Sequence, residues 1–281
     1  MSRVRVVTDS ACDLPDEVVA QYDIAVVSLT IRFGSEEFSN RADLSPREFW
    51  ARCKSSKELP ETAAPSVGAF QEVYESAARD GFDGVIVLTL SSHLSATFQS
   101  ATLAAQAVAA TIPVTVIDTL AVSMAQGLMA VDVAEAASAG ASLEQLSERA
   151  TGLIDRVGVV AALDTLEHLI KGGRVGGAKA LLGQVLSIKP LVELKGGVVA
   201  EAGRQRTRAK ALSAIAHRAQ EQAPFRRLAL IHGACSDADI ATLRSLVAPI
   251  PTEVPLIETN IGPVVGTHGG PGIIGLAWVK S

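Results

Sequence analysis

The sequence predicts an α/β protein that divides into two domains, and three observations support this. Short runs of β-branched residues alternate with segments of helical period from the start of the chain. The 281 residues, of which 48% are hydrophobic, are enough for one large core or two ordinary ones. Glycine usage and the strand pattern then change at residues 152–158. We therefore expect domains at residues 1–155 and 156–281, the second built on a mixed sheet covered by helices.

Periodicity and capping signals predict the elements of the N-terminal half. Apolar side chains within residues 66–79 recur at i, i+3, i+4 and i+7, so this segment should form an amphipathic helix. The uncharged run 93–117 is interrupted by polar residues, and we interpret it as a buried helix followed by a strand. Helices should also start after Ser45 and Ser142, each followed three residues later by Glu or Gln as in a capping box. The expected strands are residues 4–8, 24–31, 84–90 and 114–118.

The C-terminal half is expected to alternate in the same way. A strand at residues 157–163 precedes a glycine-rich segment, and residues 188–200 should form a hairpin that turns at the glycine pair 196–197. No low-complexity linker separates the halves, so we expect them to pack closely, with a ligand cleft between them. The other expected elements are helices at residues 207–222 and 236–247 and strands at 227–232, near 253–257 and at 275–279.

Composition and charge argue against several classes of function. Lys and Arg number 25 and Asp and Glu 30, and the net charge of −5 is unfavourable for a general binder of nucleic acid. The three cysteines are widely spaced and the five histidines contain no i, i+4 pair, so neither a disulfide framework nor a metal site is expected. The first residues lack the apolar segment of a signal peptide. We expect a cytoplasmic protein without a membrane-spanning segment.

Two polar loops of the N-terminal half are candidate ligand contacts, because α/β proteins place such contacts at strand ends and helix starts. The first, residues 8–15, follows the first strand, but its Ser10 and Asp13 are also suited to cap the next helix. The second, residues 62–66, precedes a helix start, where free backbone N–H groups favour an anion. Ser66 in this loop is equally suited to be a plain N-cap.

Two further loops and a basic cluster carry polar groups with no evident local use. Residues 91–101 hold four hydroxyl groups within seven positions after a strand, which favours an anion or carboxylate contact. Residues 262–272 set His268 among glycines and prolines, where a side chain approaches a ligand closely. The basic cluster at residues 204–210 is either a solvated face or the source of an arginine that reaches an anion. A nucleotide site is not expected, because Lys179 lacks the flanking residues of a phosphate loop.

Together these segments resemble the DegV family, bacterial proteins that bind fatty acids and in many species serve as the binding subunit of a fatty acid kinase. The similarity extends over the whole chain, and the order and spacing of the segments argue against a chance match. Its landmarks are TDSACDLP at 8–15, TAAPS at 62–66, SSHLSATFQSA at 91–101, LEHLIKGGRV at 166–175, RTRAKAL at 206–212 and THGGPG at 267–272.

The resemblance implies a Rossmann-like parallel sheet in the N-terminal domain and a mixed-sheet α/β domain after it. A long-chain fatty acid of the palmitate or oleate type would lie between the domains, its carboxylate held by Thr62 and Ser92. Arg174, Arg206 and His268 would form a supporting polar network. A separate ATP-using kinase subunit would phosphorylate the bound acid for phospholipid synthesis. This chain would present the substrate, would not itself be an enzyme, and would need no cofactor or metal.

The composition is compatible with such a ligand. Burial of about fifteen methylenes at ~0.8 kcal/mol each supplies a large affinity, and a buried carboxylate is tolerated when convergent donors bond it. With 4% aromatic residues, a tunnel would be lined mainly by aliphatic side chains. The chain departs from the family pattern at Ala63 and Ala64, where polar residues are common, and at His93, a bulky residue beside Ser92.

Two other functions are compatible with the same residues. The main alternative is a serine acyl hydrolase in which His268 activates Ser92, although the sequence lacks the G-x-S-x-G elbow of the common α/β hydrolases. The second alternative makes His268 the acceptor in a phosphotransfer reaction. Both depend on the immediate neighbours of His268, which the sequence does not give.

Overall fold

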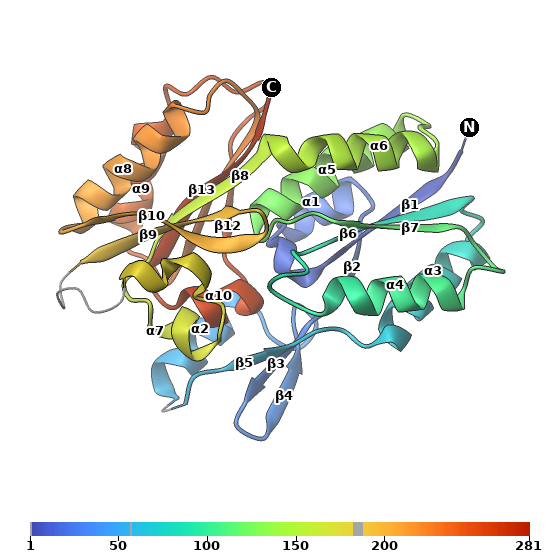
Figure 1. Cartoon of the computed structure of the whole chain (residues 1–281), viewed down its shortest axis with the longest axis horizontal. Helices are drawn as coiled ribbons and strands as arrows, with labels where there is room; N and C mark the ends of the chain where they lie inside the picture. The colour runs from blue at the N-terminus through green and yellow to red at the C-terminus, as the bar shows by residue number, and fades with distance from the viewer. Residues whose placement is uncertain (1, 57, 182–187) are drawn as a thin grey trace.

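The computed structural model describes residues 2–56, 58–181 and 188–281, and within them the strands form three sheets (Figure 1). A four-stranded sheet in the order β2-β1-β6-β7 is parallel throughout, which confirms the predicted parallel sheet of the N-terminal half. Every residue of its β6 is buried, as expected for a parallel sheet covered on both faces. The strands are β1 (Val4–Asp9), β2 (Ala25–Val27), β6 (Gly84–Thr89) and β7 (Val114–Asp118).

Helices cover both faces of this sheet, α5 and α6 on one side and α3 and α4 on the other (Figure 1). The predicted helix at residues 66–79 is confirmed, and Ser66 caps it by accepting the backbone N–H of Ala69 at 3.1 Å. The predicted capping box of Ser142 starts α6. These helices are α1 (Asp16–Gln21), α3 (Val67–Arg79), α4 (Thr97–Ala107), α5 (Met124–Ser138) and α6 (Leu143–Leu153).

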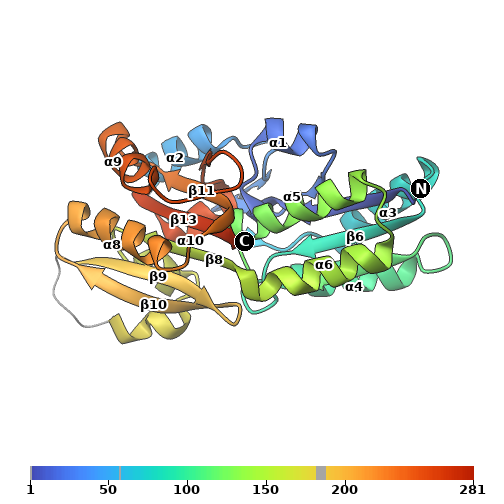
Figure 2. The same cartoon turned by 90° about the horizontal axis from the view of Figure 1, so that it is seen from above.

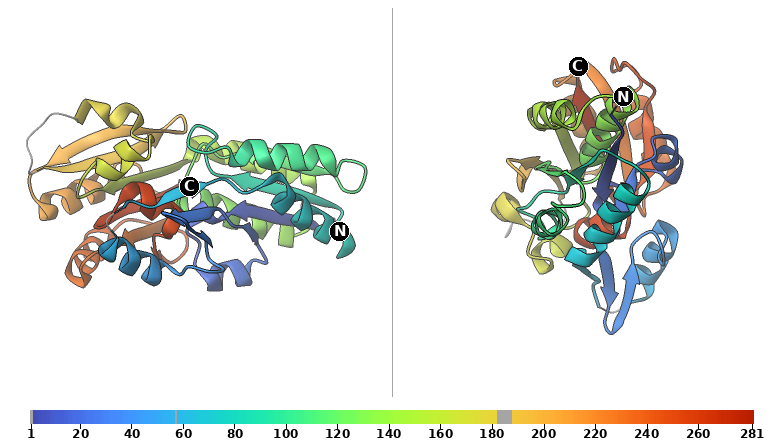
Figure 3. Two further views of the ribbon diagram at one scale, coloured as in Figure 1. Left: turned by 90° about the horizontal axis from the view of Figure 1, so that it is seen from below. Right: turned by 90° about the vertical axis from the view of Figure 1, so that its right-hand side faces the viewer.

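The prediction of one strand at residues 24–31 is wrong, because this segment forms β2 and then β3, which belong to different sheets. The chain turns away at Leu29, whose N–H donates to the Ser10 hydroxyl at 2.9 Å instead of to a neighbouring strand. β3 then starts a small antiparallel sheet that projects from the body of the molecule (Figure 3). Its elements are β3 (Thr30–Phe33), β4 (Glu36–Ser39) and β5 (Glu61–Ala63), with α2 (Pro46–Ser55) beginning at the predicted Ser45 capping box.

A six-stranded mixed sheet in the order β10-β9-β8-β13-β11-β12 forms the C-terminal half. β11 and β12 pair in parallel and the other neighbours antiparallel, which confirms the predicted mixed sheet and its hairpin. The strand expected near residues 253–257 begins only at Ile257, after Pro255, which has no N–H to donate. The strands are β8 (Val157–Ala162), β9 (Lys189–Lys195), β10 (Val198–Gln205), β11 (Phe225–Gly233), β12 (Ile257–Asn260) and β13 (Ile273–Lys280).

Two longer helices and several short helical segments complete this half. The predicted helices α8 and α9 pack on one face of the mixed sheet, over a core that contains the stacked rings of Phe225 and Trp278. Short α7 and α10 pack against each other near the other face. The helices are α7 (Glu167–Lys171), α8 (Arg208–Gln220), α9 (Asp237–Val247) and α10 (Pro263–Gly269), and the 3₁₀ turns are η1 (Ser10–Cys12), η2 (Ile154–Arg156) and η3 (Gly176–Leu181).

Helix α5 joins the two halves of the molecule. It packs against β1 of the parallel sheet and against β8 and β13 of the mixed sheet (Figure 2). One hydrophobic cluster accordingly contains residues of both halves, which confirms the expected close packing. The first two sheets end at Asp118 and the mixed sheet begins at Val157, but a domain boundary between residues 155 and 156 stays a prediction. Among the described helices, none combines the length and apolarity that crossing a membrane requires.

Candidate functional site

A cavity lies between the mixed sheet and the loops at the carboxyl ends of the parallel strands. The strand order of the parallel sheet reverses between β1 and β6, and in such folds ligands bind outside the carboxyl ends at that point. The cavity measures about 110 Å³, whereas one buried water needs about 10–15 Å³ on the same scale. Residues of both halves line it, as expected for a ligand cleft between them.

Most of the cavity wall is aliphatic. On the mixed sheet, Val159 and Ala161 of β8 face the cavity, because alternate residues of a strand point to the same side. Val160 between them belongs to the core on the opposite face. A wall of this kind suits an apolar ligand without selecting its shape. The facing wall comes mainly from Leu29, Leu90, Leu94 and Val122 of the N-terminal half.

Polar groups from distant segments meet in the same cavity. Thr62 of β5 and His268 of α10 form the clearest contact, with Thr62 Oγ1 2.9 Å from His268 Nε2. Arg174 is held by two backbone carbonyls, since its Nε donates to Leu94 at 3.1 Å and its Nη1 to Gly172 at 2.6 Å. The bond to Leu94 places the guanidinium next to Ser95, which also lines the cavity. These groups form the polar part of the cavity.

His268 is neutral at pH 7 in this environment. Burial lowers the pKa of its imidazole to about 4, and the nearby Arg174 and His168 act in the same direction. Its Nδ1 is buried and has no hydrogen-bond partner among the described residues. The ring packs against Gly172, where a Cβ would lie 2.3 Å from Nδ1, so a side chain at that position would displace the imidazole. The imidazole is therefore available as a hydrogen-bonding group and is a weak base.

The segment at residues 91–101 reaches the cavity through a different serine from the one predicted. Ser92 is exposed, does not line the cavity, and contributes its backbone N–H to Asp118 at 3.1 Å. Ser91 is buried and donates to the carbonyl of Gly197 at 2.7 Å, which ties the β9–β10 turn to this loop. Ser95 lines the cavity. His93 is exposed next to this turn. Ser95 is therefore the serine of this segment that faces the cavity, and a carboxylate contact by Ser92 stays a prediction.

The structure brings three of the five predicted site residues together. Thr62, Arg174 and His268 share the cavity, whereas Ser92 and Arg206 do not line it. Arg206 is exposed in the connection between β10 and α8. A carboxylate in the cavity would therefore meet Thr62, Arg174 and His268 before it met either of the other two.

The polar loop at residues 8–15 has a structural role that the sequence does not reveal. No side chain caps α1, so the expectation that Ser10 or Asp13 caps this helix is wrong. The buried carboxylate of Asp13 instead accepts the Ser123 hydroxyl at 2.6 Å and the Gly262 N–H at 2.9 Å. Burial raises its pKa to about 7. Asp13 thus links Ser123, which lines the cavity, to the start of α10, which carries His268.

Comparison with known proteins gives one consistent result. A model of the DegV family, described as uncharacterised proteins, matches residues 3–281. A DegV domain-containing protein of Listeria monocytogenes is 34% identical over 279 residues, which cover 98% of each chain. The protein DegV of Bacillus subtilis is 32% identical over 280 residues, again 98% of each chain. The sequence similarity therefore extends over nearly the whole length of these relatives.

Solved structures show the same relationship in three dimensions. A structure from Thermus thermophilus, described as fatty acid binding of a DegV family protein, superposes with a TM-score of 0.91 at 32% identity over 99% of this chain and 100% of its own. DegV of Bacillus subtilis, described as a fatty acid binding protein, gives a TM-score of 0.90 at 31% identity over 100% of both chains. The similarity in structure therefore extends over nearly the whole chain.

Proposed function

The chain belongs to the DegV family, and from this premise we propose that it binds a long-chain fatty acid of the palmitate or oleate type in the cavity between its halves. Two relatives of the same fold are described as fatty acid binding. The single observation that carries the proposal is the pair of Thr62 and His268 in a mostly aliphatic cavity. Such a cavity matches an alkyl chain that ends in one acidic group.

In the hydrogen bond between His268 and Thr62, the donor and the acceptor can be assigned. Nδ1 of His268 has no acceptor among the described residues, so a proton there would be a buried N–H without a partner. We therefore assign the proton to Nε2, which donates to Thr62 Oγ1. The hydroxyl hydrogen of Thr62 is then free to donate to a carboxylate oxygen. His268 orients the threonine, and the threonine contacts the ligand.

Two further groups support a carboxylate beside Thr62. Arg174 supplies positive charge, with its guanidinium already held by two backbone carbonyls. Ser95 supplies a second hydroxyl, and we propose it in place of Ser92, which is exposed. The burial of each methylene contributes about 0.8 kcal/mol, so the aliphatic wall supplies most of the affinity and the polar groups fix the orientation.

We also propose that the chain presents the bound acid to a separate fatty acid kinase, which forms the acyl phosphate used in phospholipid synthesis. The polar groups Thr62, Ser95, Arg174 and His268 are all partly exposed, which leaves them within reach of a partner. The exposed basic residues Arg204, Arg206 and Lys210 are candidates for contact with that partner. All three cysteines are free thiols, which fits the proposed bacterial cytoplasm.

The hydrolase alternative receives less support from the same geometry. Ser92 does not reach the cavity, and the imidazole contacts Thr62 instead. A threonine activated by histidine needs a third group that orients the base, but Nδ1 of His268 has no such partner among the described residues. A pKa of about 4 also makes this imidazole a poor general base near neutral pH. The low pKa argues equally against efficient phosphotransfer to His268.

The experiment that tests the function is native mass spectrometry of the purified protein, with organic extraction and identification of the molecule that co-purifies. We expect one fatty acid per chain. A protein that is empty and also fails to bind added palmitate or oleate contradicts the proposal. Ser95→Ala should weaken oleate binding, and Ser92→Ala, an exposed position in the same loop, is the matched control. If Ser92→Ala weakens oleate binding and Ser95→Ala does not, Ser92 is the carboxylate contact, as the sequence predicts.

A further inference from the structure

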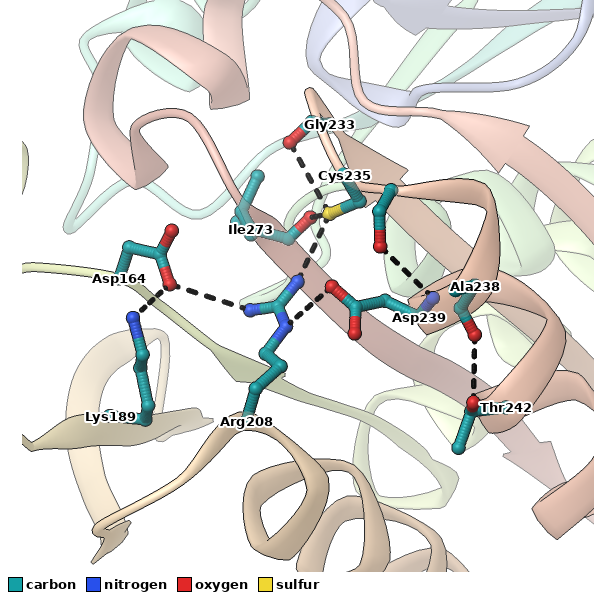
Figure 4. A network of polar contacts seen from close by, with 10 residues as sticks. Asp164, Lys189, Arg208, Gly233, Cys235, Ala238, Asp239, Thr242 and Ile273 are labelled. Atoms are coloured by element: carbon teal, nitrogen blue, oxygen red, sulfur yellow. Dashed lines mark hydrogen bonds and ion pairs between the residues drawn. The ribbon is translucent and has the colours of Figure 1, made fainter.

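The basic cluster at residues 204–210 contains one arginine that points inward. Arg204, Arg206 and Lys210 are exposed, whereas the side chain of Arg208 is only 18% exposed and lies among β8, β11 and α9 (Figure 4). Arg208 is the first residue of α8, so the start of this helix fixes its backbone. Its role is therefore separate from that of its exposed neighbours.

The guanidinium of Arg208 contacts three groups from different elements (Figure 4). Its Nε donates to Asp239 Oδ2 at 3.2 Å, and its Nη2 donates to Cys235 Sγ at 3.2 Å. Its Nη1 lies 3.7 Å from Asp164 Oδ1, the same oxygen that Lys189 Nζ contacts at 2.6 Å. Arg208 thereby connects the end of β8, the loop after β11 and the first turn of α9.

Asp164 and Cys235 are the two partners that face the turn between α10 and β13. At Gly272, with φ of +83°, a Cβ would lie 2.3 Å from Asp164 Oδ2, so the carboxylate sits directly against this turn. Cys235 Sγ donates to the carbonyl of Ile273 at 3.0 Å. The N–H of Gly272 donates to the carbonyl of Gly233 at 2.9 Å. Two of these three contacts come from Asp164 and Cys235, the residues that Arg208 contacts.

The turn between α10 and β13 also sets the position of His268 in the cavity. It follows α10 directly, and α10 carries His268. Ile273, which opens β13 on the other side of the turn, lines the cavity. The contact of 2.9 Å between His268 and Thr62 tolerates little movement, because a hydrogen bond weakens within a few tenths of an ångström. A shift of the turn that moves His268 therefore weakens its hydrogen bond with Thr62.

We propose that Arg208 is a positioning residue for the fatty acid carboxylate. Through Asp164 and Cys235 it holds the turn after α10, and with it His268, where the imidazole donates to Thr62. Arg208 does not touch the ligand. The inference rests on the proposed function for its ligand, but it also predicts a property of His268 that is measurable in the free protein.

The first test measures oleate affinity in variants of the basic cluster. Arg208→Gln removes the charge, and we expect at least a tenfold loss of affinity; Arg208→Lys should recover part of it. Lys210→Gln, an exposed change in the same helix, should leave affinity unchanged. The double variant Arg208→Gln/His268→Gln should bind no more weakly than His268→Gln alone, because both changes act on one group. Additive losses, or full affinity in Arg208→Gln, overturn the proposal.

The second test needs no ligand. In protein with ¹⁵N-labelled histidine, the ring nitrogens of His268 should report the Nε2–H form in the wild type and a mixture of both neutral forms in Arg208→Gln. If the variant melts at a lower temperature but keeps both the histidine signals and the oleate affinity, Arg208 is only structural and the proposal is wrong. If Arg208→Gln does not fold, Asp164→Asn tests the same link, because it keeps the shape of the side chain against Gly272 but removes the charge that pairs with Arg208. A wild type that binds no oleate contradicts the proposed function, while the histidine signals still decide the role of Arg208.

Discussion

Two buried carboxylates, Asp13 beside the start of helix α5 and Asp132 within the helix, are satisfied in different ways. Asp13 contacts Ser123 at the start of the helix, and both of its hydrogen bonds come from neutral groups, a hydroxyl and a backbone N–H. Asp132 lies nine residues after Ser123, ~14 Å further along the helix axis. Its Oδ1 accepts Arg149 Nε at 2.5 Å and its Oδ2 accepts Arg226 Nε. Both positions join the N-terminal half to residues of the C-terminal half.

The contacts of Asp132 hold the two halves together, whereas the contacts of Asp13 border the ligand cavity. Around Asp132, Arg226 also contacts Glu135, so the charges of the cluster are matched within it. At the cavity, which Arg174 and Glu193 also line, His268 is neutral and Thr62 keeps a hydrogen for an external acceptor. Fully paired groups stabilise a fixed arrangement, whereas groups with unused donors are available to a ligand. Substitutions at the two ends of α5 should therefore affect different properties.

The largest expected effect is on stability, from Asp132→Ala. This change leaves the guanidinium groups of Arg149 and Arg226 without their buried partner. Removal of one member of a buried ion pair costs roughly 3–5 kcal/mol, and we expect about 3 kcal/mol because both arginine side chains are more than 30% exposed. Urea unfolding measures the loss. The folded fraction should keep its oleate affinity.

The matched control is Asp155→Ala, an exposed carboxylate after α6. It should change the free energy of unfolding by less than about 0.5 kcal/mol. A loss of less than about 1 kcal/mol in Asp132→Ala would mean that the cluster does not hold the halves together. The comparison between the two ends of α5 would then fail.

The next largest effect is on binding, from Thr62→Val. The variant keeps the shape of the side chain but cannot donate to a carboxylate. A hydrogen bond to a charged group contributes about 1.5–3 kcal/mol, so oleate affinity should fall roughly ten- to hundredfold. Calorimetric titration measures this, with Thr111→Val at an exposed position as the control. Unchanged affinity would exclude Thr62 as the carboxylate contact, and a collapse in stability would place it with the Asp132 cluster instead.

The sequence predicts most regular elements because they depend on neighbours within one or two turns. The capping boxes at Ser45 and Ser142 and the helix after Ser66 are local in this sense, and the structure confirms them. The break between β2 and β3 depends on Ser10, which accepts the N–H of Leu29 from 19 residues away. Local patterns carry no information about such a contact, so the strand was predicted to continue.

In the candidate site, too, the sequence predicts local features but not contacts between distant residues. The sequence identifies the segments that meet at the cavity, since strand ends and helix starts gather at one edge of an α/β sheet. Which serine faces inward depends on Arg174, which bonds the Leu94 carbonyl from 80 residues away and fixes the loop beside Ser95. The pairing of Asp132 with Arg226 spans 94 residues. Neither arrangement leaves a periodic or compositional signal.

A smaller effect is the dependence of stability on pH that comes from Asp13. Burial raises the pKa of Asp13 to about 7 from its ordinary 3.8. The folded protein therefore binds a proton here more tightly than the unfolded chain, and this contribution to stability is lost as the pH rises from about 4 to about 7. Asp13→Asn keeps a polar group between Ser123 and Gly262 but cannot ionise. We expect it to stabilise the protein by about 1–2 kcal/mol at pH 8. The free energy of unfolding of the variant should also change less with pH below pH 8. A variant less stable than the wild type at pH 8 contradicts this.

The smallest effect has the opposite sign and comes from His268. Burial lowers its pKa to about 4 from 6.5, so the unfolded chain binds the proton more tightly, and stability is lost as the pH falls from about 6.5 to about 4. His268→Gln should remove this loss, about 1 kcal/mol in urea unfolding at pH 5. Bound oleate adds a negative charge beside the imidazole, which raises its pKa, so oleate should reduce the same loss in the wild type. If oleate does not change the stability that the wild type loses at acid pH, the carboxylate lies elsewhere in the cavity.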